Sequence, residues 1–221
     1  MPDIKNREHL LKNVRFFMNR ISYFIFTALL IATATSVSYA QSDTEDARWF
    51  IDALEVKEGS IVAEIGAGDG RLTLAMARQV GPEGHVYSSE LGADSVQYLQ
   101  NVVDDASVTN ITVIEGHPNK TNFPDKCCDA LFMRRVYHHF KNPSAMNQSI
   151  WNALKPGGRI ALIDFAPRGK ESPGSDTPSL GPQHGVTLDT VVKELRKAGF
   201  TLISSEQRSG RDIYVVMEKE E

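Results

Sequence analysis

The strongest constraint on the fold is the alternation of short apolar runs with single amphipathic stretches along most of the chain. Helices are predicted at 44–55, 71–79, 93–103, 142–154 and 187–198, and strands at 60–65, 85–89, 111–114, 130–133, 159–164, 200–204 and 213–217. Strands that are separated by single helices form a parallel sheet covered on both faces. The last two strands are joined by too short a connection for a crossover helix, so they are antiparallel. The pattern predicts an α/β fold: a doubly wound, mostly parallel seven-stranded sheet with an antiparallel last strand.

The first forty residues differ from the rest of the chain. Residues 1–20 are polar and basic, and residues 21–42 carry no charge. A basic flank, an apolar run and a small-residue site ending at Ala40 are typical of a secretory signal peptide. We therefore expect a signal peptide over 1–40, cleaved near Ala40, and one domain over 41–221 that is exported to the periplasm or secreted. Met18 is an alternative start, because translation from it gives a signal peptide of ordinary proportions.

Two other interpretations of this leader stay open. The uncharged segment 21–42 is long enough to span a bilayer of roughly 30 Å, so it could instead anchor the protein in a membrane. A buried core helix is the third interpretation, although no polar residues mark a second face.

Charge and cysteine content exclude several classes of protein. Residues 1–40 hold five of the 24 Lys and Arg residues and two of the 28 Asp and Glu residues, so the remainder has a formal charge of −7. A nucleic-acid partner is not expected, since such proteins carry a basic surface. The neighbouring Cys127 and Cys128 cannot build a disulfide framework or a metal cluster. We expect them to pack on opposite faces of a strand, and we expect no metal.

A glycine-rich turn between the first strand and the following helix carries the chemistry. Gly66, Gly68 and Gly70 follow a G-x-G-x-G spacing, whereas dinucleotide-binding turns are spaced G-x-G-x-x-G. Ligands of open α/β sheets bind outside the carboxyl ends of the strands. Glu64 and Asp69 would repel a pyrophosphate there, but they complement a ligand that carries ammonium and sulfonium groups.

The segment Glu64-Ile65-Gly66-Ala67-Gly68-Asp69-Gly70 resembles motif I of the class I S-adenosylmethionine-dependent methyltransferases, and the similarity runs from about residue 44 to 217. The resemblance implies the Rossmann-like methyltransferase fold, S-adenosylmethionine as cofactor, and methyl transfer (EC 2.1.1.-) to a small-molecule or lipid-like acceptor. In that family the second strand ends in an acid that binds the ribose hydroxyls, which places this role on Glu90. The implied cofactor-binding residues are Glu64, Gly66, Gly68, Asp69, Gly70, Glu90, Glu115, Gly116, His117 and Arg134.

One segment departs from the family pattern. Many members have an acid after the glycine that follows the third strand, where it meets the adenine amino group. This chain has His117 after Gly116, and Glu115 before it. A surface histidine is the alternative interpretation of His117.

Methyl transfer requires alignment of the acceptor with an activated methyl group. A base is needed only where the acceptor must lose a proton. The candidates at the expected sheet edge are Tyr137, His138, His139, Asp164 and His184, of which His139 and His184 are preferred. Hydrogen-bonded packing beside the pocket is the alternative role for each.

Two other functions remain open at this point. One is a non-catalytic S-adenosylmethionine-binding sensor or interaction domain of the cell envelope, because the cofactor is made in the cytoplasm while this chain carries an export signal. The other is an NAD(P)-dependent oxidoreductase, against which the glycine spacing argues. An open pocket with apolar walls would favour an enzyme acting on a lipid or quinone, and a blocked pocket would favour the sensor.

Overall fold

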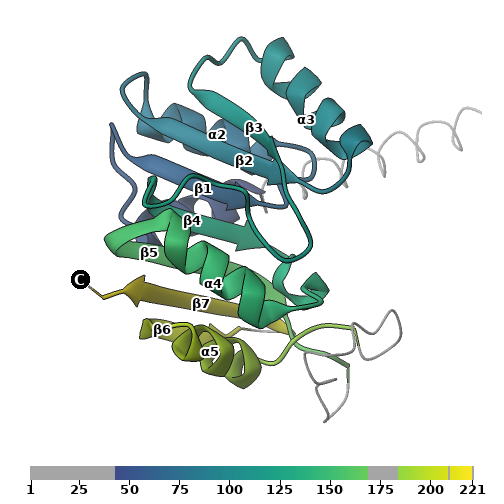
Figure 1. Cartoon of the computed structure of the whole chain (residues 1–221), viewed down its shortest axis with the longest axis vertical. Helices are drawn as coiled ribbons and strands as arrows, with labels where there is room; N and C mark the ends of the chain where they lie inside the picture. The colour runs from purple at the N-terminus through teal and green to yellow at the C-terminus, as the bar shows by residue number, and fades with distance from the viewer. Residues whose placement is uncertain (1–42, 169–183, 209, 221) are drawn as a thin grey trace, which may run out of the picture. The chain divides into compact units, whose positions relative to one another are not determined.

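The computed structural model describes residues 43–168, 184–208 and 210–220 (Figure 1). The expected leader over 1–40 and the alternative anchor over 21–42 lie outside these residues. The unit that carries the site spans Asp46–Glu221. None of the helices in the described ranges is both long and apolar enough to cross a membrane.

The described strands form one seven-stranded sheet in the order β3-β2-β1-β4-β5-β7-β6. Neighbours from β3 through β5 pair in parallel, and β7 is antiparallel to both β5 and β6. This arrangement confirms the predicted fold class. The strands are β1 (Ile61–Ile65), β2 (His85–Glu90), β3 (Ile111–Glu115), β4 (Cys128–Arg134), β5 (Leu154–Phe165), β6 (Phe200–Gln207) and β7 (Asp212–Lys219).

Helices cover both faces of the sheet. Residues 43–53 are helical, and the other helical segments are α2 (Arg71–Val80), α3 (Ala93–Asp105), the 3-10 helix η1 (Tyr137–His139), α4 (Pro143–Ala153) and α5 (Leu188–Lys197). Figure 1 shows α4 and α5 on the near face of the sheet. Polar side chains cap the first turns of both helices: Asn142 accepts a hydrogen bond from the backbone N–H of Ala145, and Thr187 accepts one from Thr190.

Two hydrophobic clusters form the core, one against each face. Neighbouring strand residues point to opposite faces, so Phe132 packs with Phe50 and α2 while Leu131 packs with α4 and α5. The sheet between them is buried on both sides, which explains the near-continuous apolar runs of its central strands.

Strand ends differ from the prediction where pairing, rather than the apolar pattern, sets the boundary. β5 begins at Leu154 instead of residue 159 and includes the Pro-Gly-Gly turn, because Leu154 pairs with Cys128 across a register shift in β4. The predicted loop over 167–185 lies largely outside the described residues.

The strand order places a switch point beside β1. The chain moves outward from β1 to β2 and β3, then returns to the opposite side of β1 as β4. Connections diverge at such a point and leave a crevice at the carboxyl ends of the strands.

Candidate functional site

The turn after β1 wraps closely around the end of the strand. Gly66, Gly68 and Gly70 have φ values of 74°, 56° and 76°, a left-handed conformation that glycine adopts without strain. A Cβ on Gly66 would lie 2.5 Å from Cγ2 of Val136, whereas one on Gly68 would meet no atom of the described residues within 4 Å. Gly66 is therefore required for packing, and Gly68 presents its backbone to open space.

Glu90 joins the end of β2 to this turn. Its Oε1 accepts a hydrogen bond from the backbone N–H of Gly68 at 2.5 Å, and its Oε2 accepts one from Leu91 at 3.1 Å. The carboxylate thus lies at the mouth of the crevice beside the glycine turn, which is the position expected for it.

A cavity of about 510 Å³ opens at the carboxyl ends of β1 to β4. This volume lies in the range of small-molecule sites. Seven of the predicted site residues line it: Gly66, Gly68, Glu90, Gly116, His117, Arg134 and His139. The other predicted site residues, which are Glu64, Asp69, Gly70, Glu115 and His184, are absent from its lining.

The structure does not place the carboxyl group of Glu64 at the cavity, where it was expected to contact the ligand. Glu64 is absent from the lining of the cavity, and the residue is only 2% exposed. The hydroxyls of Thr73 and Ser88 donate hydrogen bonds to it. Burial is the main cause that raises its pKa to about 7, partly offset by those two hydrogen bonds. Glu64 therefore anchors α2 to β1 and β2 instead of facing a ligand.

Three further predicted site residues lie outside the lining of the cavity. Asp69 forms an ion pair with Arg71 at 3.1 Å, with both side chains more than half exposed. Gly70 starts α2 and packs against α3, where a Cβ would lie 3.0 Å from side-chain atoms of Leu99 and Val102. Glu115 is exposed at the end of β3. Asp69 and Gly70 belong to the turn and the start of α2, and none of the three residues lines the cavity.

Arg134 lies at the end of β4 and lines the cavity. Its Nη1 contacts Oδ2 of Asp46 at 2.9 Å, with 29% of the arginine side chain exposed. The ion pair fixes the guanidinium at the cavity wall, so the helix that contains Asp46 helps to shape the site.

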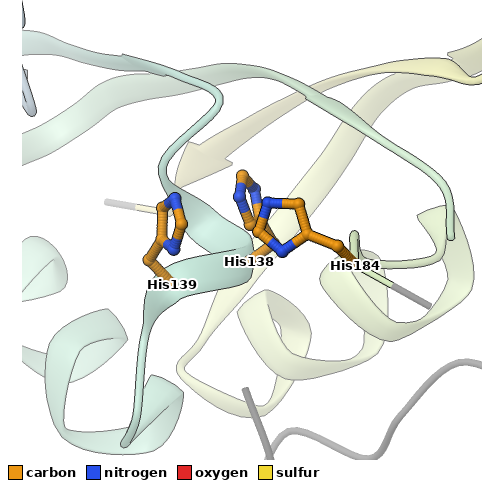
Figure 2. A group of neighbouring side chains, drawn as sticks. All are labelled: His138, His139 and His184. Carbon is orange, nitrogen blue, oxygen red and sulfur yellow. The ribbon is translucent and has the colours of Figure 1, made fainter. Parts of the chain in front are cut away.

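Three histidines lie close together (Figure 2), and one of them, His139, lines the cavity. His138 and His139 come from η1, and His184 comes from the segment before α5. The ring centre of His138 lies 3.9 Å from that of His139 and 4.3 Å from that of His184. Burial, followed by the two neighbouring imidazoles, lowers the pKa of His139. His184 thus joins the cluster through His138 and His139 rather than by lining the cavity.

Asp164 holds His138 in place. Its Oδ1 lies 2.7 Å from Nδ1 of His138, and its Oδ2 accepts a hydrogen bond from the backbone N–H of the same residue. Tyr137, the remaining candidate, is buried between Glu194 and Asn147, to which its hydroxyl is hydrogen-bonded. Burial, together with Glu194, raises the pKa of Tyr137, which argues for a packing role.

Sequence reasoning missed the apolar wall of the cavity. Val136, Phe140 and Met146 line it, and Val136 packs against Gly66 of the glycine turn. Phe140 and Met146 carry no signal that separates them from core residues, because both are buried apolar side chains.

The structure also differs from the sequence analysis in how the two cysteines are arranged. Cys127 and Cys128 form a disulfide with each other, instead of packing separately on opposite faces. The alternation rule fails here because β4 begins only at Cys128 and its register shifts before Ala130.

Comparisons with known proteins agree on one class. A family model described as a methyltransferase domain matches residues 56–209. The chain is 25% identical over 120 residues to the ubiquinone/menaquinone biosynthesis C-methyltransferase of Vibrio cholerae, covering 54% of this chain and 46% of that protein. It is 24% identical over 205 residues to the phosphoethanolamine N-methyltransferase of Triticum aestivum, covering 90% and 40%. The chain thus spans less than half the length of these curated relatives.

Among solved structures, a SAM-dependent methyltransferase from Aquifex aeolicus superposes with a TM-score of 0.68 at 22% identity, covering 78% of this chain and 89% of that one. At this identity the likeness concerns the fold alone.

Proposed function

Because the chain belongs to the methyltransferase domain family and its cofactor is S-adenosylmethionine, we propose that it transfers the cofactor's methyl group to a small-molecule acceptor with an apolar part. The observation that carries this proposal is the open cavity, which is lined both by the glycine turn and Glu90 and by apolar side chains.

The cofactor side of the cavity fits the group it has to hold. Gly68 leaves room for close approach to the backbone, and the carboxylate of Glu90 offers acceptor oxygens for a pair of hydroxyls. Gly116, His117 and Arg134 complete the candidate set on this side. The cofactor supplies a sulfonium methyl that is already activated, so the protein has only to bind and orient it.

The acceptor side favours an apolar molecule. Val136, Phe140 and Met146 form the wall there and exclude water from the reacting atoms. Two relatives named for quinone biosynthesis and for phosphoethanolamine support a small-molecule acceptor. We assign His139, which lines the cavity, to accept a proton from the acceptor where one must leave. His184 supports His139 from a ring-centre distance of 5.4 Å.

Calorimetric titration tests the cofactor assignment. The purified protein should bind S-adenosylmethionine at micromolar concentrations and should not bind NADH. Glu90→Ala should abolish binding, whereas Glu83→Ala, which alters an exposed acid in the turn before β2, should leave it unchanged. Equal binding by the two variants would contradict the assignment of Glu90. NADH binding would favour the oxidoreductase.

Turnover separates the enzyme from the sensor. With quinol, phenol and amine acceptors, the protein should release S-adenosylhomocysteine in a reaction that needs the acceptor. Cofactor binding without turnover on any of these would favour the non-catalytic sensor. The open cavity supports the enzyme, because a sensor that binds no acceptor requires space for the cofactor alone.

We also propose that residues 1–40 export the domain, as the basic flank and the uncharged run suggest. A fusion of residues 1–60 to alkaline phosphatase, which is active only outside the cytoplasm, should be active and should begin at Gln41 after processing. Changing Leu29→Arg and Leu30→Arg together should abolish the activity. An uncleaved fusion recovered with membranes would favour the anchor.

A further inference from the structure

Three imidazoles from separate parts of the chain meet at one point beside the cavity. One nitrogen from each of His138, His139 and His184 lies within 4.8 Å of the others, and Figure 2 shows the three rings grouped together. Ligand atoms of a tetrahedral site with bonds of about 2.0–2.1 Å lie roughly 3.4 Å apart. Small side-chain rotations would therefore bring these nitrogens to binding distance.

The strongest sign of a ligand is the orphaned nitrogen of His138. Its side chain is only 2% exposed, and its Nε2 has no hydrogen-bond partner among the described residues. A buried polar atom without a partner carries a substantial free-energy cost. A metal ion bound to this nitrogen would remove that cost.

The other nitrogen of His138 already has the partner that a metal ligand needs. Nδ1 lies 2.7 Å from Oδ1 of Asp164, and that oxygen also accepts a hydrogen bond from the backbone N–H of Phe165. Metal-binding histidines commonly donate their second N–H to a carboxylate, which fixes the ring and makes the free nitrogen a better ligand. Asp164 is 1% exposed, so its charge acts in a site shielded from water.

We propose that His138, His139 and His184 bind one divalent transition-metal ion, with Asp164 orienting His138. Three imidazoles favour zinc, copper, nickel or iron over magnesium and calcium, which prefer oxygen ligands. Three protein ligands leave a coordination position for water or substrate, as in catalytic zinc sites. His139 also lines the cavity, so the ion would adjoin the space assigned to the acceptor. The proposal concerns metal binding and does not depend on methyl transfer. With the ion bound, His139 is a ligand, so the role of proton acceptor assigned to it above applies to the metal-free protein.

Titration with zinc tests the site directly. Protein purified without a histidine tag and stripped with a chelator should bind one equivalent of Zn²⁺ by calorimetry. Co²⁺ should give the visible absorption of a tetrahedral complex. Asp164→Asn should weaken zinc binding by about 10–100-fold, and His184→Ala should weaken it further. His85→Ala is the matched control, because His85 in β2 is hydrogen-bonded to Thr112 in β3 and lies outside the cluster.

The outcomes are distinct. Zinc binding lost in His184→Ala and kept in His85→Ala supports the site. No binding by the folded parent protein, or equal binding in both variants, would overturn it. His139→Ala, at an exposed position, gives a second test if His184→Ala fails to fold, as judged by circular dichroism. Titration of the stripped protein with S-adenosylmethionine reports on the cofactor separately, so failure of one assignment leaves the other measurable.

Discussion

Glu64 precedes the last residue of β1 and Glu90 ends the neighbouring β2, yet their carboxyl groups have different surroundings. Glu64 shares a strand face with Val62, because side chains two apart point the same way, and α2 covers that face. Glu90 lies at the cavity and binds the glycine turn. Glu90, Gly66 and Gly68, which the motif predicts as site residues, line the cavity, and their contact with a ligand stays a prediction. Glu64 does not line the cavity, because the buried hydroxyls of Thr73 and Ser88 donate hydrogen bonds to its carboxyl group instead.

The first prediction concerns the buried Glu64 carboxyl group. With a pKa near 7 in the folded protein, against about 4.3 in an unfolded chain, Glu64 takes up a proton on folding between these two pH values. Its contribution to stability is full below about pH 4 and is lost as the pH rises to 7. Glu64→Gln removes this loss, so the free energy of unfolding relative to the parent should rise by on the order of 2 kcal/mol from pH 5 to pH 8.

Urea unfolding at the two pH values measures this difference. Glu83→Gln, at an exposed position, is the control and should follow the parent at both. Parallel pH profiles for Glu64→Gln and the parent would show that Glu64 is ionised in the folded protein.

A second prediction concerns Gly66. In Gly66→Ala the new methyl would lie 2.5 Å from Val136, a β-branched side chain with little rotational freedom. Gly59→Ala is a matched control, because Gly59 has a similar φ of 84° and no described atom near the added Cβ. Both variants carry a backbone cost of roughly 1–2 kcal/mol, and Gly66→Ala should lose about 1–3 kcal/mol more from overpacking. Urea unfolding of the pair checks this, and equal losses would refute the clash.

At the scale of elements, the start of a helix depends on a capping side chain nearby in the sequence, so a single substitution can test it. The side chain of Asn142 caps α4 by accepting a hydrogen bond from Ala145 at 3.1 Å. Asn142→Ala should lower the free energy of unfolding by about 0.5–2 kcal/mol, and Asn142→Asp should retain most of the stability because aspartate caps equally well. Thermal unfolding of the two variants is the measurement. An unchanged alanine variant would mean that water replaces the cap without cost.

Elements were predictable where a local pattern defines them. The helices and central strands follow apolar periodicity and glycine or proline stops, so their existence and order agree with the sequence analysis. The meeting of His184 with η1 was harder to foresee, since the two positions are 45 residues apart and the sequence before His184 has no apolar periodicity. His139 and His184 were preferred among the residues expected at the sheet edge, and their shared contact with His138 emerged only from the fold.

At the scale of the whole molecule, the cofactor should stabilise the folded state. A ligand at 100 times its dissociation constant adds about 2.7 kcal/mol when it binds only the folded protein. S-adenosylmethionine should therefore raise the melting temperature of the parent and of Glu83→Ala, but not that of Glu90→Ala. Differential scanning calorimetry with and without cofactor tests this. An equal rise in Glu90→Ala would place the cofactor elsewhere.

The position of β7 has a consequence for the order in which the chain becomes structured. β6 reaches the sheet only through β7, which pairs with β5 on its other side. During synthesis, all the strands that border the cavity emerge before β7, while β6 must wait for the last eight-residue strand, Asp212–Lys219. A nascent chain that stops before β7 already contains the residues of the site, but its β6 has no neighbouring strand to pair with. The pairing of β6 in the sheet is therefore complete only after β7 has been synthesised.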